Sequence, residues 1–408
     1  MNDATAHAAH FFLQLSVILV ACRACGFVMR LVGQPVVIGE MVAGVLLGPS
    51  LLGTLAPGFA QWVFPADSRP VLFAVAQLGL TLYMFAVGLE FRSDLLRSNL
   101  RRAGAVSLAG ILAPFSLGAG VAVGLTGHQG FFGSEVSPFA AALFLGAAMS
   151  ITAFPMLARM IVEHSLTGTA TGTIALTAGS FDDVAAWILL AAVLGTISGS
   201  PWLVITALGG GVVYALVCWK VLRPLLARFA GCFKDGTTLG ALVLLLMLGA
   251  WYTDFIGLYS VFGAFILGLV VPRGGLAEKT AERVGPITSA LLLPVFFTYS
   301  GLNTQIGLLD TGFLWMVCGL IIVIAVAGKL FACYGAARWS GSGRSEALAI
   351  ASLMNARGLM ELILLNIGLQ AGVITETLFA ILVIMAIVTT LMAAPGFNLS
   401  QRLRSNGC

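Results

Sequence analysis

Two adjacent acidic residues, Asp182 and Asp183, lie in the middle of a long apolar stretch of the chain. If that stretch crosses a membrane, each carboxylate costs roughly 2.5–3.5 kcal/mol or more to bury, and such residues mark functional sites. Neighbouring positions on a helix point about 100° apart, so the two carboxylates meet different surroundings. One of them can bind a cation or a proton while the other contacts a neighbouring helix. The alternative is a pair of salt bridges that fixes helix packing.

Three further charged residues lie deep inside apolar stretches, namely Lys329, Arg357 and Glu361. Arg357 and Glu361 are spaced i, i+4, so they can pair with each other on one helix. Lys329 has no acid within one helical turn. Its partner must come from another segment, for which Asp182 or Asp183 is the candidate. We predict that these three residues compensate charge at a buried site.

Two of the apolar stretches are interrupted. The first break is Ser150-Ile151-Thr152-Ala153-Phe154-Pro155, where the proline removes a backbone donor and clashes with the preceding turn. The second break is Asn355-Ala356-Arg357-Gly358. An ordinary proline kink would explain the first break by itself, but two breaks at related positions predict a transport site. Ser150, Thr152 and the carbonyl groups freed by the break are the candidate ligands of a small cation.

The elements that hold these residues must span a membrane. Only 9% of the 408 residues are charged and 59% are hydrophobic, whereas an ordinary soluble domain carries about 25% charge. A bilayer crossing takes about 20 mostly apolar residues. By this criterion the sequence predicts an all-α polytopic membrane protein with about thirteen transmembrane helices. They are expected at about residues 11–32, 36–53, 70–91, 103–126, 138–162, 168–195, 201–222, 237–253, 257–272, 286–303, 312–336, 345–370 and 373–397.

The basic residues between these stretches predict the orientation. Arg69 is the one basic residue among the segments that follow the even-numbered stretches. Because basic loops stay on the cytoplasmic side, we expect the N-terminus outside and the C-terminus in the cytoplasm. The basic segments follow the odd-numbered stretches, at residues 92–102, 220–234, 273–283, 338–344 and 402–404.

Two glycine motifs recur seven stretches apart. Seven is an odd offset, so matching stretches must cross in opposite directions, which is typical of the inverted repeat of a secondary transporter. The first pair of motifs is Gly39-x4-Gly44-x4-Pro49 and Gly263-x4-Gly268-x3-Pro272, and the second is Gly88-Leu89-x5-Leu95-Leu96 and Gly301-Leu302-x5-Leu308-Leu309.

Five segments between residues 39 and 368 carry a family resemblance that covers nearly the whole membrane domain. They are Gly39-Glu40-Met41-Val42-Ala43-Gly44-Val45-Leu46-Leu47-Gly48-Pro49, the first break at 150–155, Phe181-Asp182-Asp183-Val184-Ala185-Ala186-Trp187, Gly328-Lys329, and Asn355-Ala356-Arg357-Gly358-Leu359-Met360-Glu361-Leu362. Together they resemble the second branch of the monovalent cation:proton antiporters. That branch includes bacterial Na⁺/H⁺ and K⁺/H⁺ exchangers and plant cation/proton exchangers.

The resemblance implies a single transmembrane exchanger domain over residues 1–408, with two crossed, broken helices and no soluble regulatory domain. Elements at about 103–195 and 312–397 would form a mobile core. Those at about 11–91 and 201–303 would form a dimerisation scaffold. A homodimer in the lipid of a plasma (inner) membrane is the corresponding expectation.

By the same resemblance, Asp183 matches the carboxylate that binds either the cation or the proton, and Thr152 matches the hydroxyl in the crossing helix. Asp182 matches the preceding acid, which pairs with a lysine at the Lys329 position in electrogenic members. We expect Lys329 to release a second proton, which makes the exchange electrogenic. Many potassium-type relatives carry Asn or Gln in place of Asp182, yet the sequence around the two breaks is most similar to potassium-linked exchangers. The choice between Na⁺ and K⁺ therefore stays open.

The predicted function is secondary active antiport of a monovalent cation, Na⁺ or K⁺, for H⁺ by alternating access. A carboxylate that has lost its water favours a bound proton, and a cation competes for the same place. The sequence has no G-x-x-x-x-G-K-[ST] motif, and its four histidines lie in termini or loops, so we expect no enzymatic activity, cofactor, nucleotide or nucleic acid. The alternatives are a cation channel, which would need a selectivity filter, and a secondary transporter of organic solutes or anions, which would need more basic groups at the centre.

Overall fold

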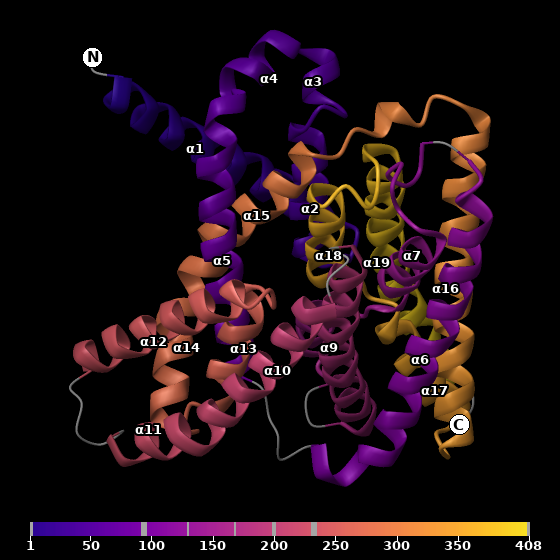
Figure 1. Cartoon of the computed structure of the whole chain (residues 1–408). Helices are drawn as coiled ribbons and strands as arrows, with labels where there is room; N and C mark the ends of the chain where they lie inside the picture. The colour runs from indigo at the N-terminus through magenta and orange to yellow at the C-terminus, as the bar shows by residue number, and fades with distance from the viewer. Residues whose placement is uncertain are drawn as a thin grey trace.

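The computed structural model describes residues 3–90, 96–128, 130–166, 169–197, 201–229 and 235–405. Over these residues the chain is helical apart from turns, loops and one isolated β-bridge between Phe132 and Ile374. The start of α1 (Asp3–Leu31) and the end of α19 (Glu376–Ser405) lie at opposite ends of the helical bundle (Figure 1). The prediction of an all-α protein is confirmed.

The other helices follow one another through short connections. Those of the first half are α2 (Val36–Leu47), α3 (Leu52–Leu55), α4 (Pro57–Val63), α5 (Arg69–Glu90), α6 (Leu96–Leu125), α7 (Pro138–Ser150), α8 (Phe154–Glu163) and α9 (Ala170–Ile197). Those of the second half are α10 (Pro201–Val217), α11 (Arg223–Phe229), α12 (Asp235–Phe255), α13 (Ser260–Val270), α14 (Gly275–Ile287), α15 (Leu293–Leu302), α16 (Gly312–Trp339), α17 (Arg344–Met354) and α18 (Leu359–Gln370).

The described helices include nine stretches that are long and apolar enough to cross a bilayer. Three shorter apolar helices accompany them, at Pro138–Ser150, Ser260–Val270 and Glu361–Gln370. The total of thirteen crossings stays a prediction. The stretch predicted at 286–303 lies inside a longer helical segment, because α14 begins at Gly275 and continues through a π-helical turn into α15. Charged residues in α14 lower its hydropathy without interrupting the helix.

The helices pack as two groups that lie side by side (Figure 1). One group contains α1, α2, α5 and α10 to α15, and the other contains α6 to α9 and α16 to α19. The groups meet where α10 packs against α9 and where α19 contacts α2. The roles expected for them, a dimerisation scaffold and a mobile core, stay predictions.

Glycines of the predicted repeat form the helix crossings in the first group. Gly44 on α2 lies against Gly301 on α15, and Gly268 on α13 lies against Gly88 on α5. At each of these four positions, an added Cβ would overlap backbone atoms of the facing helix. The first motif of each repeat thus packs against the second motif of the other repeat. This reciprocal packing is the arrangement that an inverted repeat produces.

The second group contains the two interrupted helices. Residues 151–153 separate α7 from α8, and residues 355–358 separate α17 from α18. The breaks touch, since the backbone N–H of Ala153 donates to the carbonyl oxygen of Ala356 at 3.1 Å. The half-helices cross there, with α18 packed against α7 and α17 against α8. Gly358 ends the second break with a φ of +148°, a conformation that side chains rarely adopt.

The glycine crossings yield a test of stability. We expect Gly301→Ala to lower the melting temperature of the detergent-purified protein, because the new methyl group has to displace the backbone of α2. Overpacking of this kind costs about 1–3 kcal/mol or more. Gly120→Ala on α6 is the matched control, since a Cβ there meets open space. A Gly301→Ala protein as stable as the control would contradict the close crossing.

Candidate functional site

The acidic pair lies on α9, where this helix packs against both broken helices. The helix contacts α7, α8, α17 and α18 as well as α6. Asp182 and Asp183 are each 1% exposed. They meet different surroundings, as their adjacent positions on a helix require.

Asp182 is fully hydrogen-bonded. Its Oδ1 accepts from the hydroxyl of Ser107 at 2.6 Å, and its Oδ2 accepts from the hydroxyl of Thr152 at 2.6 Å and from Nζ of Lys329 at 2.9 Å. The lysine forms a buried ion pair with it, with both side chains 1% exposed or less. Hydrogen bonds to a carboxylate and a neighbouring cation both stabilise the charged form. The predicted pairing of Asp182 with Lys329 is present in the structure.

Ser107 is a residue that sequence reasoning missed. It lies on α6, 3% exposed, and donates to Oδ1 of Asp182, whereas Thr152 and Lys329 donate to Oδ2. The same helix carries Ser116, whose hydroxyl donates to the carbonyl of Leu112 on its own helix. Nothing in the local sequence distinguishes the two serines, so only the packing of α6 against α9 selects Ser107.

Asp183 has the opposite environment. Neither of its carboxylate oxygens accepts a hydrogen bond from any described residue, although both are buried. The backbone N–H of Phe154, the first residue of α8, interacts with this carboxylate. A buried carboxylate without hydrogen bonds is unstable as a bare charge, so it favours a bound proton or a bound cation.

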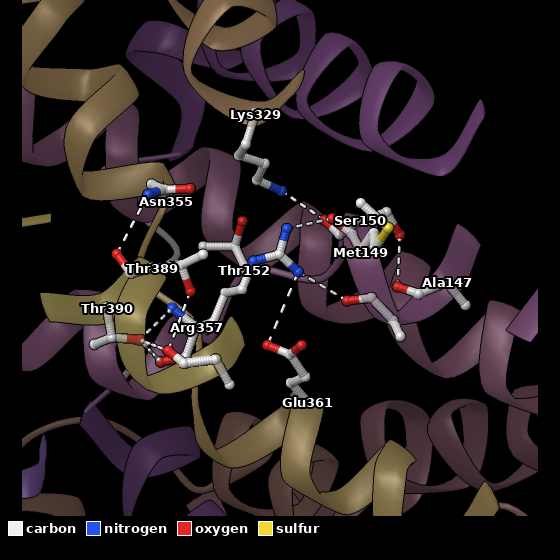
Figure 2. A network of polar contacts seen from close by, with 12 residues as sticks. Ala147, Met149, Ser150, Thr152, Lys329, Asn355, Arg357, Glu361, Thr389 and Thr390 are labelled. Carbon is white, nitrogen blue, oxygen red and sulfur yellow. Dashed lines mark hydrogen bonds and ion pairs between the residues drawn. The ribbon is translucent and has the colours of Figure 1, made fainter. Parts of the chain in front are cut away.

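The carbonyl groups at the end of α7 are occupied by cationic side chains, as Figure 2 shows. Nζ of Lys329 donates to the carbonyl of Ser150 at 2.5 Å. Nη1 of Arg357 donates to Ala148 at 2.8 Å, and its Nη2 donates to Met149. The carbonyls of the last turn of α7 therefore have protein donors, and their role as cation ligands, like that of Ser150, stays a prediction. Two positive charges neutralise the negative end of that helix.

The two predicted hydroxyls also have protein partners. Ser150 Oγ donates to the carbonyl of Ala147 at 2.9 Å, within its own helix. Thr152 Oγ1 lies within hydrogen-bonding distance of two acceptors, Asp182 Oδ2 at 2.6 Å and the carbonyl of Met354 at 3.0 Å, which share its one proton. Thr152 therefore ties the first break to the second and to α9.

The second break is held by α19. The backbone N–H of Arg357 donates to the hydroxyl of Thr390 at 3.1 Å, and that hydroxyl reaches the carbonyl of Arg357 at 2.8 Å. Nδ2 of Asn355 donates to the carbonyl of Thr389 at 3.2 Å. Thr389 and Thr390 were not predicted from the sequence, because threonines are common in apolar helices. Glu361 follows on α18, with Oε2 3.8 Å from Nη1 of Arg357 (Figure 2).

The sequence of this chain matches one known protein family over most of its length. The profile of one family, described as "Sodium/hydrogen exchanger, transmembrane", matches residues 15–398. This chain belongs to that family. It is an integral, multi-pass membrane protein of the exchanger family, as its apolar helices require.

Several curated relatives align along nearly the whole exchanger chain. The Na(+)/H(+) antiporter NhaS4 of Synechocystis sp. is 40% identical over 388 residues, which are 93% of this chain and 94% of that protein. Cation/H(+) antiporter 17 of Arabidopsis thaliana is 39% identical, and K(+)/H(+) antiporter 1 of Saccharomyces cerevisiae is 32% identical, each over 94% of this chain. The chain spans about half the length of the plant and yeast relatives, 47% and 46%.

The fold of the exchanger matches a solved structure. The sodium proton antiporter MjNhaP1 from Methanocaldococcus jannaschii superposes with a TM-score of 0.68. The match covers 97% of this chain and 100% of that chain, at 18% sequence identity. At that identity the likeness concerns the fold alone. It agrees with the all-helical architecture described above.

The donors around Asp182 yield a second test. We expect Ser107→Ala to lower the melting temperature, because a buried, charged acceptor loses one of its three donors. Leaving such a group short of a hydrogen bond costs about 1–3 kcal/mol. Ser116→Ala on the same helix is the control, because this serine is exposed and bonds within α6. Equal melting temperatures for the two variants would show that Ser107 contributes nothing to Asp182.

Proposed function

We propose that this exchanger moves a monovalent cation, Na⁺ or K⁺, in one direction and H⁺ in the other, with Asp183 as the shared binding site. The observation that carries the proposal is the difference between the two acids. Asp182 accepts from three side chains, whereas Asp183 is buried beside the breaks and accepts from no described side chain. Membership of the sodium/hydrogen exchanger family supports the same reaction. Relatives of 32–40% identity carry Na(+)/H(+), K(+)/H(+) and cation/H(+) antiporter names.

Exchange follows from the electrostatics of Asp183. Its charge is compensated when it holds either a proton or a cation, and each ligand displaces the other. An ionised, empty Asp183 would carry an uncompensated charge into the bilayer, which is costly. The group of α6 to α9 and α16 to α19 therefore crosses between its two orientations with the acid loaded. Outward movement with one ligand and return with the other gives antiport without a nucleotide.

The other predicted residues have supporting roles in this scheme. Thr152 and Ser150 are proposed to line the cation position at the first break, next to Asp182. Lys329 compensates Asp182 and the end of α7, and Arg357 compensates the same helix end and lies beside Glu361. The cation thus meets a site in which Asp182 is already paired with Lys329.

The proposed function also includes a membrane, an orientation in it and an oligomeric state. We place the exchanger in a plasma (inner) membrane with the N-terminus outside and the C-terminus in the cytoplasm, because basic residues follow the odd-numbered stretches. We propose a homodimer that is formed by the group of α1, α2, α5 and α10 to α15. The proposal includes no enzymatic activity and no cofactor.

A dye assay in proteoliposomes separates exchange from the two alternatives. An imposed pH gradient should collapse on addition of Na⁺ or K⁺ if the protein is an antiporter. A cation channel would carry current without coupled proton movement, and a transporter of organic solutes or anions would leave the gradient unchanged. Parallel additions of Li⁺, Na⁺, K⁺ and Rb⁺ identify the cation.

The binding role of Asp183 is tested by its neutral isostere. We expect Asp183→Asn to abolish cation-dependent proton movement for every cation, because the asparagine can hold neither ligand. The protein should remain folded, since the native carboxylate accepts no hydrogen bond from the described residues. Asp310→Asn, at an exposed position after α15, is the matched control. Retained exchange in a folded Asp183→Asn protein would refute the assignment.

The charge moved per cycle is tested with a clamped membrane potential. We expect electrogenic exchange of two protons for one cation, so a potential should shift the cation ratio at equilibrium. A potential of 100 mV is worth about 2.3 kcal/mol for one net charge, which corresponds to a ratio of roughly fifty. The measurement compares proteoliposomes with a valinomycin-clamped potential and with zero potential. A cation ratio indifferent to the potential would show that one proton is exchanged.

A further inference from the structure

Glu361 is a second carboxylate that the charge pairing leaves unsatisfied. Its side chain is 0% exposed, and neither Oε1 nor Oε2 accepts a hydrogen bond. Among the described residues, Asp183 is the other acid with both oxygens buried and without a hydrogen bond. The feature that marks Asp183 as a site for a proton is therefore present twice, once on α9 and once on the first turn of α18.

Arg357 does not satisfy this carboxylate. Nη1 of Arg357 is 3.8 Å from Oε2, beyond hydrogen-bonding distance, and it donates at 2.8 Å to the carbonyl of Ala148 instead. Its Nη2 donates to Met149, and its Nε has no hydrogen-bond partner among the described residues. An ionised carboxylate beside a guanidinium forms hydrogen bonds of about 2.7–2.9 Å. The 3.8 Å separation fits a neutral, protonated Glu361, and so do the oxygens of Glu361 and the Nε of Arg357, which have no hydrogen-bond partner in the described part of the chain.

Lys329 is less suited to release a proton. Its Nζ donates to Asp182 at 2.9 Å and to Ser150 at 2.5 Å. Asp182 cannot move away from the lysine freely, because Ser107 and Thr152 also hold it. Loss of a proton from Lys329 would leave the carboxylate of Asp182 without its cationic partner. Loss of a proton from Glu361 breaks no hydrogen bond that the structure contains, and it allows a new one to Arg357.

The charged groups around Glu361 come from three helices or their connections. Arg357 precedes it by one turn, and Lys329 on α16 is within electrostatic range of it. The neighbouring α9 carries Asp182 and Asp183, and α7 carries no charged residue. Of the other helices that contact α18, α15 carries no charged residue and α19 carries its charged residues in its end turns.

We propose that Glu361 carries the second proton of the exchange cycle. The inference rests on the proposed function, in which Asp183 holds the first proton or the cation. With protons bound, Asp183 and Glu361 are neutral and Arg357 holds the end of α7. When the cation binds Asp183, both carboxyl groups release their protons to water on the side to which the site is open. Glu361 then pairs with Arg357.

The charges balance in this scheme. With two protons bound, Lys329 and Arg357 are positive and Asp182 is negative, so the cluster carries one net positive charge. With the cation bound, three carboxylates balance Lys329, Arg357 and the cation. One net charge crosses the membrane per cycle, as two-for-one exchange requires. The cluster is neutral when the cation is bound.

Infrared difference spectroscopy of the unmodified protein tests the proposal without a variant. A protonated carboxyl group has a C=O stretching band that disappears on ionisation, whereas a lysine has none. Addition of the transported cation should remove two such bands. Loss of a single band, with a second proton released to the medium, would assign that proton to Lys329 and overturn the proposal.

The variant Glu361→Gln tests it by transport. The amide mimics the protonated form, so we expect folded protein that exchanges one proton for one cation and ignores the membrane potential. Linkage predicts that the apparent KM for the cation rises about 100-fold per unit of falling pH when two protons compete, and about 10-fold when one does. The exposed Glu376→Gln should retain the steep dependence. An unchanged slope in Glu361→Gln would contradict the assignment.

Two further outcomes keep the inference separate from the proposed function. Asp183→Asn should abolish exchange altogether, whereas Glu361→Gln should change its stoichiometry. If Glu361→Gln does not fold, Glu361→Asp decides the question, because it should shift the frequency of one of the two infrared bands. Two unshifted bands in Glu361→Asp would exclude Glu361 as a proton carrier.

Discussion

The arrangement of this exchanger depends on the compensation of five ionisable side chains that are buried together. Asp182, Asp183, Lys329, Arg357 and Glu361 are each 1% exposed or less. At an effective dielectric constant of about 20, opposite charges 4 Å apart attract by roughly 4 kcal/mol, so each partner strongly affects the next. The protein satisfies one acid completely and leaves two without hydrogen bonds. Because of this difference, Asp182 can stay fixed while Asp183 and Glu361 exchange their ligands.

The broken helices are tied to the same charges. A helix that ends inside the bilayer exposes carbonyl groups that water cannot reach. Here Lys329 and Arg357 bind the end of α7, and Thr390 holds the backbone of the second break. Lys329 therefore stabilises a helix end as well as the carboxylate of Asp182, and Arg357 stabilises the same helix end beside Glu361. A change of charge at the acids can move the half-helices, because the same side chains contact both.

The other helix group is held by a different kind of contact. Its crossings place glycine against glycine, Gly44 with Gly301 and Gly88 with Gly268, so that backbones pack directly. Such contacts leave little freedom for sliding, since no flexible side chain lies between the helices. This rigidity suits the part of the molecule against which the group with the charged cluster would move.

The sequence by itself determined the location in a membrane, the two breaks, the acidic pair and the inverted repeat, and it limited the partner of Lys329 to Asp182 or Asp183. These features follow from local properties, namely hydropathy, proline and glycine positions, and the cost of burying a charge. The tertiary structure alone decided which serine of α6 reaches Asp182, that Arg357 binds carbonyls at the end of α7, and that Glu361 is left without donors. Hydrogen-bond partners join segments far apart in the chain, and chemically equal candidates such as Ser107 and Ser116 differ only in where packing places them.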